Sequence, residues 1–215
     1  MSAKQKLEHI YRQLLSCYDP QHWWPADDPF EVIIGAILTQ STAWVNVEKA
    51  IANLKHAGVL DPDSLHRIPV EDLAKLIRPS GYYNVKALKV KAFVERLNIY
   101  CNSLDEMFTP DIPELRANLL SIYGIGEETA DSVILYAALK PVFVIDAYTH
   151  RIMERLGMNA DYGNYTALQD QFMKNLPHDE RMFNEYHALF VRHGKDVCKK
   201  SSPLCSGCCL NDLCL

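Results

Sequence analysis

The residues that decide the fold are 119–133, which read LLSIYGIGEETADSV. One helical pattern ends at the Gly-Ile-Gly triplet of 124–126, and a second helical pattern begins directly after it. Small residues at 130 and 132 allow the two helices to cross closely, and glycines around an apolar residue expose backbone N–H groups that can bind a phosphate. The stretch therefore predicts a helix-hairpin-helix. The predicted contacts to a nucleic-acid backbone are Gly124, Ile125, Gly126 and Thr129.

Helical hydrophobic periodicity extends over most of the remaining chain. The helices expected from it cover residues 1–16, 29–38, 43–57, 70–77, 83–101, 112–121, 127–139, 145–156, 164–176 and 179–195. The helix at 29–38 is apolar nearly all round, so we expect it at the centre of a core. The β-like run at 142–145 has no pairing partner of similar character and is interpreted as the start of the next helix. The sequence therefore predicts an all-α protein.

Charge and hydropathy exclude several classes of protein. The chain has 215 residues and a net charge of −5, which argues against attraction of its whole surface to polyanions. Two short segments are basic nevertheless: residues 78–96 carry five basic side chains and residues 192–200 carry four, each against one acidic side chain. Such runs are either solvated faces or phosphate contacts. The longest apolar stretch, Val32 to Leu38, is too short to span a bilayer, and the N-terminus lacks a signal-peptide pattern, so we expect a cytoplasmic protein without membrane contact.

Cysteines are concentrated at the C-terminal end, where five of the seven lie within the last eighteen residues. Four have the spacing Cys198-x6-Cys205-x2-Cys208-x5-Cys214, in a polar loop with no helix or strand to bury them. Thiolate ligation of a metal is the favoured interpretation, with buried thiols or a redox pair as alternatives. Zinc prefers paired C-x2-C knuckles, whereas one compact loop with unequal gaps suits the corners of an iron–sulfur cubane. The cysteines expected outside the ligand set are Cys17 and Cys101, as core residues, and Cys209.

Five motifs along the chain resemble, in order and spacing, those of endonuclease III. They are the hairpin, GAILTQST at 35–42, GYYNVKA at 81–87, Val-Ile-Asp at 144–146 and the terminal cysteine loop. The resemblance covers residues 20–214 and implies the helix-hairpin-helix DNA glycosylase superfamily, whose members flip a damaged base out of the duplex and cleave its N-glycosidic bond.

The resemblance also implies two interleaved domains. A six-helix barrel with the hairpin would cover residues 22–134, and an iron–sulfur cluster domain would combine residues 1–21 with residues 135–215. We expect the active site in the cleft between them, with Glu128 and Asp146 on its two sides. The ligands of a 4Fe-4S cluster would be Cys198, Cys205, Cys208 and Cys214.

Departures from the family pattern indicate a subfamily. Endonuclease III carries a lysine after the hairpin that attacks the sugar C1′, and the matching position here is Glu128. A carboxylate cannot form the Schiff base of that route, and the nearest downstream lysine is Lys140. Gly-Ile-Gly followed by an acidic residue, Ala-Asp at 130–131 and Asp-Ala-Tyr at 146–148 together resemble the 3-methyladenine DNA glycosylase III branch, which is monofunctional. That branch is not generally built around the terminal cluster, so the chain combines features of both.

The resemblance assigns the catalytic carboxylates. Asp146 matches the aspartate that stabilises the oxocarbenium-like sugar and positions a water, as paired carboxylates do in sugar hydrolysis. Glu128 either joins this chemistry or only shapes the pocket. Because an alkylated purine already carries positive charge, its departure needs no strong general acid, and an electron-rich aromatic slot is enough to hold it.

The residues expected to hold the base and fill the duplex come from the same resemblance. Trp24 and Trp44 match the aromatic pair around the base, with Trp23 as a neighbour, although a tryptophan at such a position is also common in core packing. Gln40 and Tyr82 match the residues that fill the hole left by the flipped base. Tyr82 has the alternative of packing against its own loop.

Three functions remain open from the sequence. The first is hydrolytic removal of an alkylated base, the second is removal of an oxidised pyrimidine or a mismatched thymine or uracil, and the third is DNA binding without catalysis around a structural cluster. Asp146 argues against the third, and Glu128 argues against lyase activity in the second. We expect a monomer, associated with the nucleoid, that binds double-stranded DNA containing a damaged base. Lys199 and Lys200 are expected to contact its phosphates.

Overall fold

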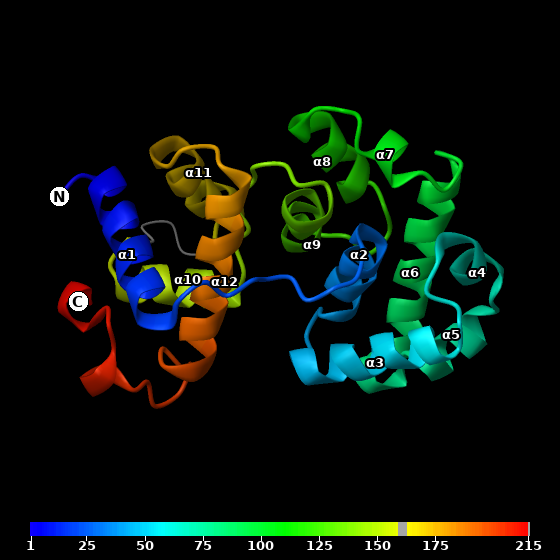
Figure 1. Cartoon of the computed structure of the whole chain (residues 1–215), viewed down its shortest axis with the longest axis horizontal. Coiled ribbons are helices and arrows are strands. Elements are labelled where there is room, and N and C mark those ends of the chain that lie inside the picture. The colour runs from blue at the N-terminus through cyan, green and yellow to red at the C-terminus, as the bar shows by residue number, and fades with distance from the viewer. Residues whose placement is uncertain (159–162, 215) are drawn as a thin grey trace. The chain divides into compact units, whose positions relative to one another are not determined.

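The computed structural model describes residues 1–158 and 163–214 and divides into two compact units. The central unit is Trp24–Leu139, and the terminal unit joins Met1–Trp23 to Lys140–Leu215, so both ends of the chain belong to one unit (Figure 1). We expected the boundaries after residues 21 and 134, and the structure has them after residues 23 and 139. Residues 159–162 and 215, which the expected cluster domain includes, lie outside the described residues.

All regular secondary structure in the described ranges is helical, which confirms the all-α fold. The helices of the central unit are α2 (Pro29–Leu38), α3 (Trp44–His56), α4 (Pro62–Arg67), α5 (Val70–Leu76), η1 (Arg78–Ser80), α6 (Tyr83–Asn98), α7 (Leu104–Met107), α8 (Ile112–Leu120), α9 (Glu127–Ser132) and the π-helical turn η2 (Val133–Ala137). Those of the terminal unit are α1 (Ala3–Tyr18), α10 (Ala147–Arg155), α11 (Tyr165–Asn175), α12 (Glu180–Asp196), η3 (Cys205–Gly207) and η4 (Asn211–Leu213). None of the described helices is long and apolar enough to cross a membrane.

Helix α2 forms the centre of the central unit. Asp28 caps its N-terminus by accepting a hydrogen bond from the Glu31 N–H, and every residue from Phe30 to Leu38 is buried. The helix packs against α3, α6, α9 and η2, which confirms the central position expected from its apolar surface. Burial of each of its large aliphatic side chains stabilises the fold by about 1.5–3 kcal/mol. The hairpin that follows α8 is therefore built onto a rigid core.

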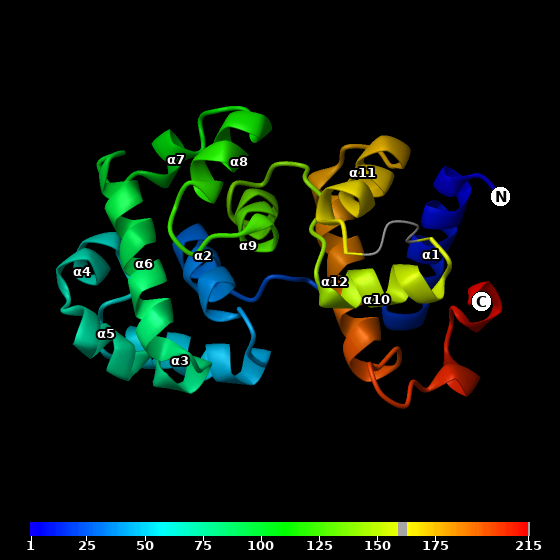
Figure 2. The ribbon, with the colours of Figure 1, turned by 180° about the vertical axis from the view of Figure 1, so that it is seen from behind.

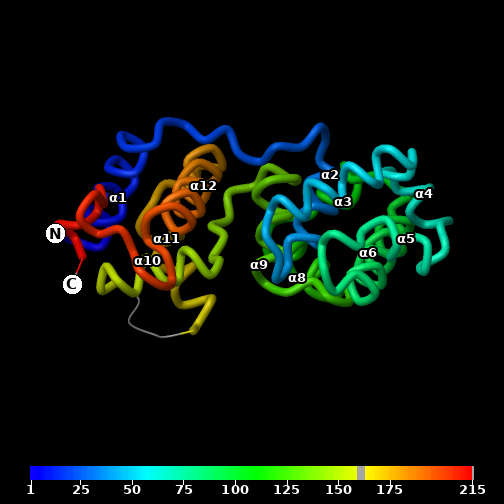
Figure 3. The backbone as a smooth tube through the Cα atoms, turned by 90° about the horizontal axis from the view of Figure 1, so that it is seen from below, coloured from blue at the N-terminus to red at the C-terminus, as the bar shows by residue number. Residues whose placement is uncertain are grey.

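The terminal unit has a core of aromatic rings. Phe143 stacks on Phe172 with ring centroids 3.8 Å apart, and Tyr186 stacks on Phe190 at 4.7 Å. The Tyr186 hydroxyl donates to the Leu7 carbonyl at 2.9 Å, which ties α1 to α12. Helix α10 packs across α12 within this unit (Figures 2 and 3). The two helices fix the positions of Asp146 and of the cysteine loop.

The structure differs from the expected helices at four places. Helices α4 and α7 were not expected, because each is short and buries one side chain, Leu65 or Met107, which leaves no periodicity to detect. The helix expected at 127–139 changes into a π-helical turn at Val133, where five consecutive residues are buried and no amphipathic pattern marks the change. The helix expected at 145–156 begins at Ala147, because Asp146 is its N-cap.

Candidate functional site

The two glycines of the hairpin are required for different reasons. Gly124 has φ +81°, and a Cβ at this position would lie 2.3 Å from Cγ of Lys89, so neither the backbone conformation nor the space allows a side chain. Gly126, the N-cap of α9, has φ −96° and open space where a Cβ would stand. The fold itself does not need glycine at 126. Its absent side chain leaves the backbone accessible to an approaching ligand.

Some backbone amides of the hairpin donate hydrogen bonds within the fold, and others are available to a ligand. The Ile125 N–H donates to the carbonyl three residues earlier at 3.1 Å, and its side chain is buried. No backbone carbonyl of the described residues accepts from Gly124 or Gly126. Thr129 is buried, and its hydroxyl is engaged inside the unit. The Ile125 N–H and the Thr129 hydroxyl therefore hold the hairpin, whereas the amides of Gly124 and Gly126 can meet a phosphate. The expected phosphate contacts of all four residues stay predictions.

A buried ion pair fixes the angle between α8 and α9. The Arg116 guanidinium donates to both carboxylate oxygens of Asp131, at 2.7 and 3.2 Å, and to Oε1 of Glu127 at 3.2 Å. Asp131 is completely buried, so this forked pairing is what makes its charge tolerable in the core. Sequence reasoning missed Arg116, because nothing in the pattern of α8 distinguishes it from a solvated cation.

Gln40, expected to fill the DNA after base flipping, is bonded to the hairpin. Its amide Nε2 donates to the Gly124 carbonyl and to Oγ1 of Thr129, both at 3.0 Å. The Lys89 ammonium donates to Oε1 of Gln40 at 2.5 Å, and the aliphatic stem of Lys89 packs over Gly124. The side chain is half-buried and held at both ends of its amide. Sequence reasoning did not single out Lys89 for any role at Gln40.

Glu128 lies where the resemblance placed it, on the second residue of α9 directly after the hairpin. Its side chain is exposed, and its backbone carbonyl accepts from the Ser132 hydroxyl at 2.7 Å. The neighbouring Glu127 pairs with Arg116, so the acidic charge presented at this end of α9 is that of Glu128.

Asp146 is the N-cap of α10 in the terminal unit. Its Oδ1 accepts from the Thr149 N–H at 2.7 Å, and its Oδ2 lies 3.8 Å from Nε2 of His187 on α12. The residue is 8% exposed. Burial lowers the pKa of His187 below the ordinary range of a histidine, although the nearby Asp146 charge opposes this shift. At neutral pH an uncharged histidine therefore stands beside the carboxylate and does not cancel its charge.

Sequence reasoning did not single out His187, although the sequence carries a signal for it. It is a polar residue inside the run YHALFV at 186–191, on the buried side of α12. A titratable side chain among core residues is a candidate for contact with a functional group. Its partner, Asp146, could not be identified before the packing of α10 on α12 was known.

The two tryptophans expected around the base belong to the central unit and contact each other. Trp24 and Trp44 meet edge to face, with ring centroids 5.2 Å apart and planes at 85°. Trp24 also contacts Tyr136 at 5.3 Å, and Trp44 donates from Nε1 to Glu48 at 2.9 Å. The two rings contact each other and do not form two parallel faces with a slot between them, so their role around the base stays a prediction. Trp23 lies in the terminal unit and is half-buried.

Tyr82 is at the surface. It is 74% exposed and has φ 44°, at the residue before α6. The alternative that it packs against its loop is therefore not what the structure shows. An exposed aromatic ring at a turn is available to a partner.

The basic segment at 78–96 is not the phosphate-facing patch that its charge suggested. Lys86 is buried and donates to two backbone carbonyls at 2.8 and 2.6 Å, and burial lowers its pKa to about 8. Lys91 donates to backbone carbonyls at the C-terminal end of α4. Arg96 donates to Asn118 at 2.9 Å, whereas Arg78 is exposed. Most of these cations bind acceptors inside the unit, which corrects the expectation.

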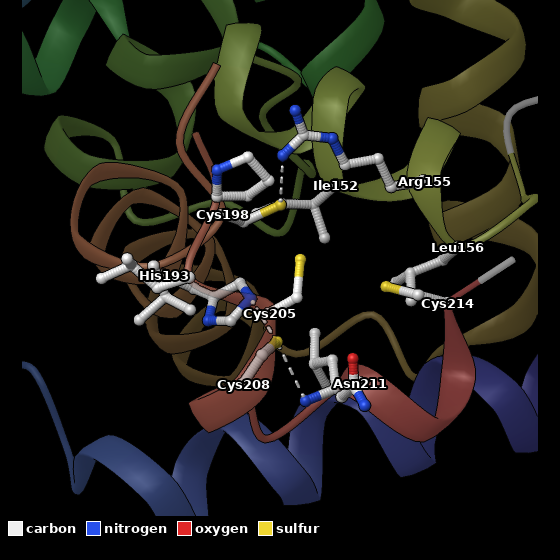
Figure 4. Close-up of a pocket in the computed structure, with 13 residues that line it drawn as sticks. Ile152, Arg155, Leu156, His193, Cys198, Cys205, Cys208, Asn211 and Cys214 are labelled. Carbon is white, nitrogen blue, oxygen red and sulfur yellow. Dashed lines mark hydrogen bonds between the residues drawn. The ribbon is translucent and has the colours of Figure 1, made fainter. Parts of the chain in front are cut away.

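The four expected ligand cysteines line one pocket of the terminal unit. The pocket is formed by the C-terminal loop with α10 and α12, and Figure 4 shows the four sulfur atoms turned toward one space. Two of the sulfurs accept hydrogen bonds: Cys198 from Arg155 at 3.1 Å and Cys208 from the Leu210 N–H at 3.3 Å. Among the described residues, no three His, Cys, Asp or Glu side chains are close enough together to hold a single metal ion.

Two arginines of α10 hold the start of this loop. Arg151 donates to the Cys198 and Gly194 carbonyls, both at 2.8 Å. Arg155 donates to the carbonyls of Lys199 and Lys200 as well as to the Cys198 sulfur. The side chains of both lysines are exposed, where a phosphate could reach them.

The other cysteines differ from expectation. Cys17 and Cys101 are exposed rather than core residues, because Cys17 is in the last turn of α1 and Cys101 is in the turn after α6. Cys209 is half-buried and lies near Cys17, and its place outside the ligand set stays a prediction. Burial is the main cause that raises the pKa of Cys209 to about 12.

Comparison with known proteins places the chain in a family. The family described as "HhH-GPD superfamily base excision DNA repair protein" matches residues 34–178. A protein of Methanocaldococcus jannaschii named as a DNA repair glycosylase is 44% identical over 208 residues, which cover 96% of this chain and 94% of that protein. Endonuclease III of Thermotoga maritima is 30% identical over 208 residues, covering 97% and 92% of the two chains.

A solved structure agrees with the relatives. The H. pylori 3-methyladenine DNA glycosylase bound to 1,N6-ethenoadenine has a TM-score of 0.78 at 27% identity, with 91% of this chain and 98% of that chain covered. This chain belongs to the HhH-GPD superfamily of base excision DNA repair proteins and is a DNA glycosylase of that type.

Proposed function

We propose that this chain is a monofunctional glycosylase that hydrolyses the N-glycosidic bond of an alkylated purine, such as 3-methyladenine, flipped out of duplex DNA. The observation that carries the proposal is Glu128, an exposed carboxylate at the position after the hairpin. A Schiff base requires an amine nucleophile, and a carboxylate cannot supply one. Hydrolysis would leave intact strands with an abasic site.

Asp146 supplies the negative charge in the proposed mechanism. One carboxylate oxygen is held by the Thr149 N–H, which fixes the orientation of the group. The other lies 3.8 Å from an uncharged His187, so the carboxylate keeps its charge for the developing sugar cation. A fixed anion beside an oxocarbenium-like sugar stabilises the transition state and can orient the attacking water.

The base would be held by stacking on Trp24 and Trp44. Insertion between the rings would separate the edge-to-face pair, at a cost of about 0.5–1.5 kcal/mol. Stacking of a desolvated cationic base on a tryptophan face contributes about 2 kcal/mol of cation–π attraction. This gain exceeds the cost of separating the two rings, so binding favours cationic alkylated purines over neutral bases. The glycosylase of H. pylori bound to 1,N6-ethenoadenine, at 27% identity, supports a modified purine as substrate.

A second candidate is removal of oxidised pyrimidines or of mismatched thymine or uracil. It is favoured by the relatives named endonuclease III, of which the T. maritima protein is 30% identical.

A 4Fe-4S cluster on Cys198, Cys205, Cys208 and Cys214 is part of the proposal. The residues fit this group: all four thiols line one pocket, and hydrogen bonds from Arg155 and Leu210 to two sulfurs are of the kind that stabilise thiolate ligands. The bound cluster would supply a covalent cross-link of the loop, and no step of base removal is assigned to it.

A panel of lesions tests the proposal. Duplexes carrying 3-methyladenine, 1,N6-ethenoadenine, 5-hydroxycytosine, or thymine or uracil opposite guanine would be assayed for free base and, after alkali, for strand breaks. We expect release of 3-methyladenine, which is cationic in DNA, ahead of the neutral 1,N6-ethenoadenine, with a loss of turnover by orders of magnitude in Asp146→Asn while lesion-DNA binding is kept. Release of the pyrimidines alone would favour the second candidate, and release of no base would contradict both.

A further inference from the structure

Gln40 is hydrogen-bonded to the hairpin through its amide nitrogen and to Lys89 of α6 through its amide oxygen. Its Nε2 donates to the Gly124 carbonyl and to Thr129, and its Oε1 accepts from the Lys89 ammonium. The stem of Lys89 lies over Gly124, close enough that a Cβ there would be 2.3 to 2.7 Å from its carbons. Lys89 therefore contacts both the residue expected to enter the duplex and the glycine whose amide is expected to meet a phosphate.

A side chain that enters a duplex works best when it is already rigid. A glutamine has several rotatable bonds, and fixing them during binding lowers the affinity because rotamer freedom is lost at that moment. In this protein the freedom of Gln40 is already restricted by three hydrogen bonds, one of them from a charged donor and therefore the strongest. Of these three hydrogen bonds, the one from Lys89 can be removed by a point substitution that alters neither Gln40 nor the hairpin backbone.

We propose that Lys89 is a positioning residue that fixes Gln40 on the helix-hairpin-helix, so that Gln40 is in place to fill the duplex when the hairpin binds the adjacent phosphates. This rests on the proposed function and on the expectation from the family resemblance that Gln40 fills the hole left by the flipped base. Lys89 acts on DNA through Gln40 and not through a phosphate. The neighbouring Lys86 and Lys91 have no such part, since their ammonium groups bind backbone carbonyls elsewhere.

The test uses a duplex with a tetrahydrofuran abasic site, which presents the hole without requiring knowledge of the damaged base. The full chain, Lys89→Met, Gln40→Ala and the double variant would be compared for affinity over a range of salt concentrations. Methionine keeps the unbranched stem over Gly124 and removes the ammonium. We expect Lys89→Met to weaken binding about three- to tenfold in the wild-type background and to have no further effect in Gln40→Ala.

Controls separate positioning from charge and from folding. Lys91→Met removes the same charge from the same helix, two residues away, and should leave the abasic affinity unchanged once its melting temperature has been compared. The salt slope of Lys89→Met should equal that of the wild type, whereas loss of a phosphate contact lowers the slope by about one.

The outcomes distinguish this inference from the proposed function. Additive effects of the two substitutions, a lower salt slope, or tighter binding by Lys89→Met would overturn the role of Lys89 while leaving Gln40 as the filling residue. If Gln40→Ala alone does not change the abasic affinity, the part of Gln40 in the proposed function fails, and the role of Lys89 fails with it.

Discussion

The hairpin of the central unit and the cysteine loop of the terminal unit are both expected to face the DNA backbone, but they are stabilised in different ways. The hairpin is held by the Arg116–Asp131 pair, by the Lys89 stem over Gly124 and by the bonds of Gln40. In the loop from 198 to 214, the buried residues are Cys198 and Leu210, and most of the others are exposed.

The hairpin is therefore a motif that its own contacts hold folded, whereas the cysteine loop requires a cross-link. A loop of seventeen residues with two buried side chains cannot offset the entropy of ordering its backbone. The hairpin has a buried charge pair and a packed core helix beneath it. We expect perturbations of the metal ligands to disorder the loop alone and perturbations of Arg116 to act on the hairpin alone.

Removal of one ligand should have the largest effect. Cys208→Ser should lose the brown colour and the iron of the purified protein, and trypsin should cleave after Lys199 and Lys200 at least about tenfold faster, because the loop is no longer cross-linked. Cys101→Ser, an exposed cysteine of the central unit, is the control and should change neither. A colourless wild-type protein with stoichiometric zinc would show that the metal has been misassigned.

Breaking the buried Arg116–Asp131 pair tests how the hairpin is stabilised. Arg116→Leu leaves the Asp131 charge buried without its partner, so the free energy of unfolding should fall by about 3–5 kcal/mol in denaturant titration. Arg192→Leu removes an exposed arginine paired with Asp196 and should cost about 0–1 kcal/mol. Equal losses from the two variants would mean that the hairpin does not depend on this pair.

Reversal of charge on the loop should weaken binding to every duplex alike. Lys199→Glu with Lys200→Glu should lower the salt slope of DNA affinity by about two and the affinity itself by about tenfold or more, because both lysines are expected to contact phosphates. Lys4→Glu with Lys6→Glu makes the same change on exposed residues of α1 and serves as the control. A change in lesion preference at constant affinity would instead show that the loop contacts the damaged base and not the phosphates.

Mild acid should affect the terminal unit through His187. Because burial lowers its folded-state pKa, the unfolded chain binds a proton first as the pH falls below about 6.5, and stability is lost in that range. The slope contributed by one histidine is at most about 1.4 kcal/mol per pH unit. Hydrogen exchange of α12 at pH 5 and pH 7 should show this loss, and His187→Asn should reduce it. An unchanged pH response in the variant would assign the effect to other groups.

The sequence predicted the fold and the motifs better than the orientation of individual side chains. Gly124 and Gly126 marked the hairpin correctly, because turn chemistry is local. The inward direction of Lys86 could not be predicted, since a lysine stem can lead its ammonium to buried carbonyls as readily as to solvent. The angle between Trp24 and Trp44 depends on packing with Tyr136, which is distant in sequence.

Borohydride trapping tests most directly the claim that this glycosylase works without an amine nucleophile. The wild type would be incubated with each lesion duplex and sodium borohydride, and the products analysed for covalent complexes on denaturing gels. Endonuclease III is the positive control, and Glu128→Lys is the matched variant of this chain. We predict free base and intact abasic strands with no trapped complex for the wild type. Efficient trapping would show that another amine reaches C1′ and would contradict the monofunctional mechanism.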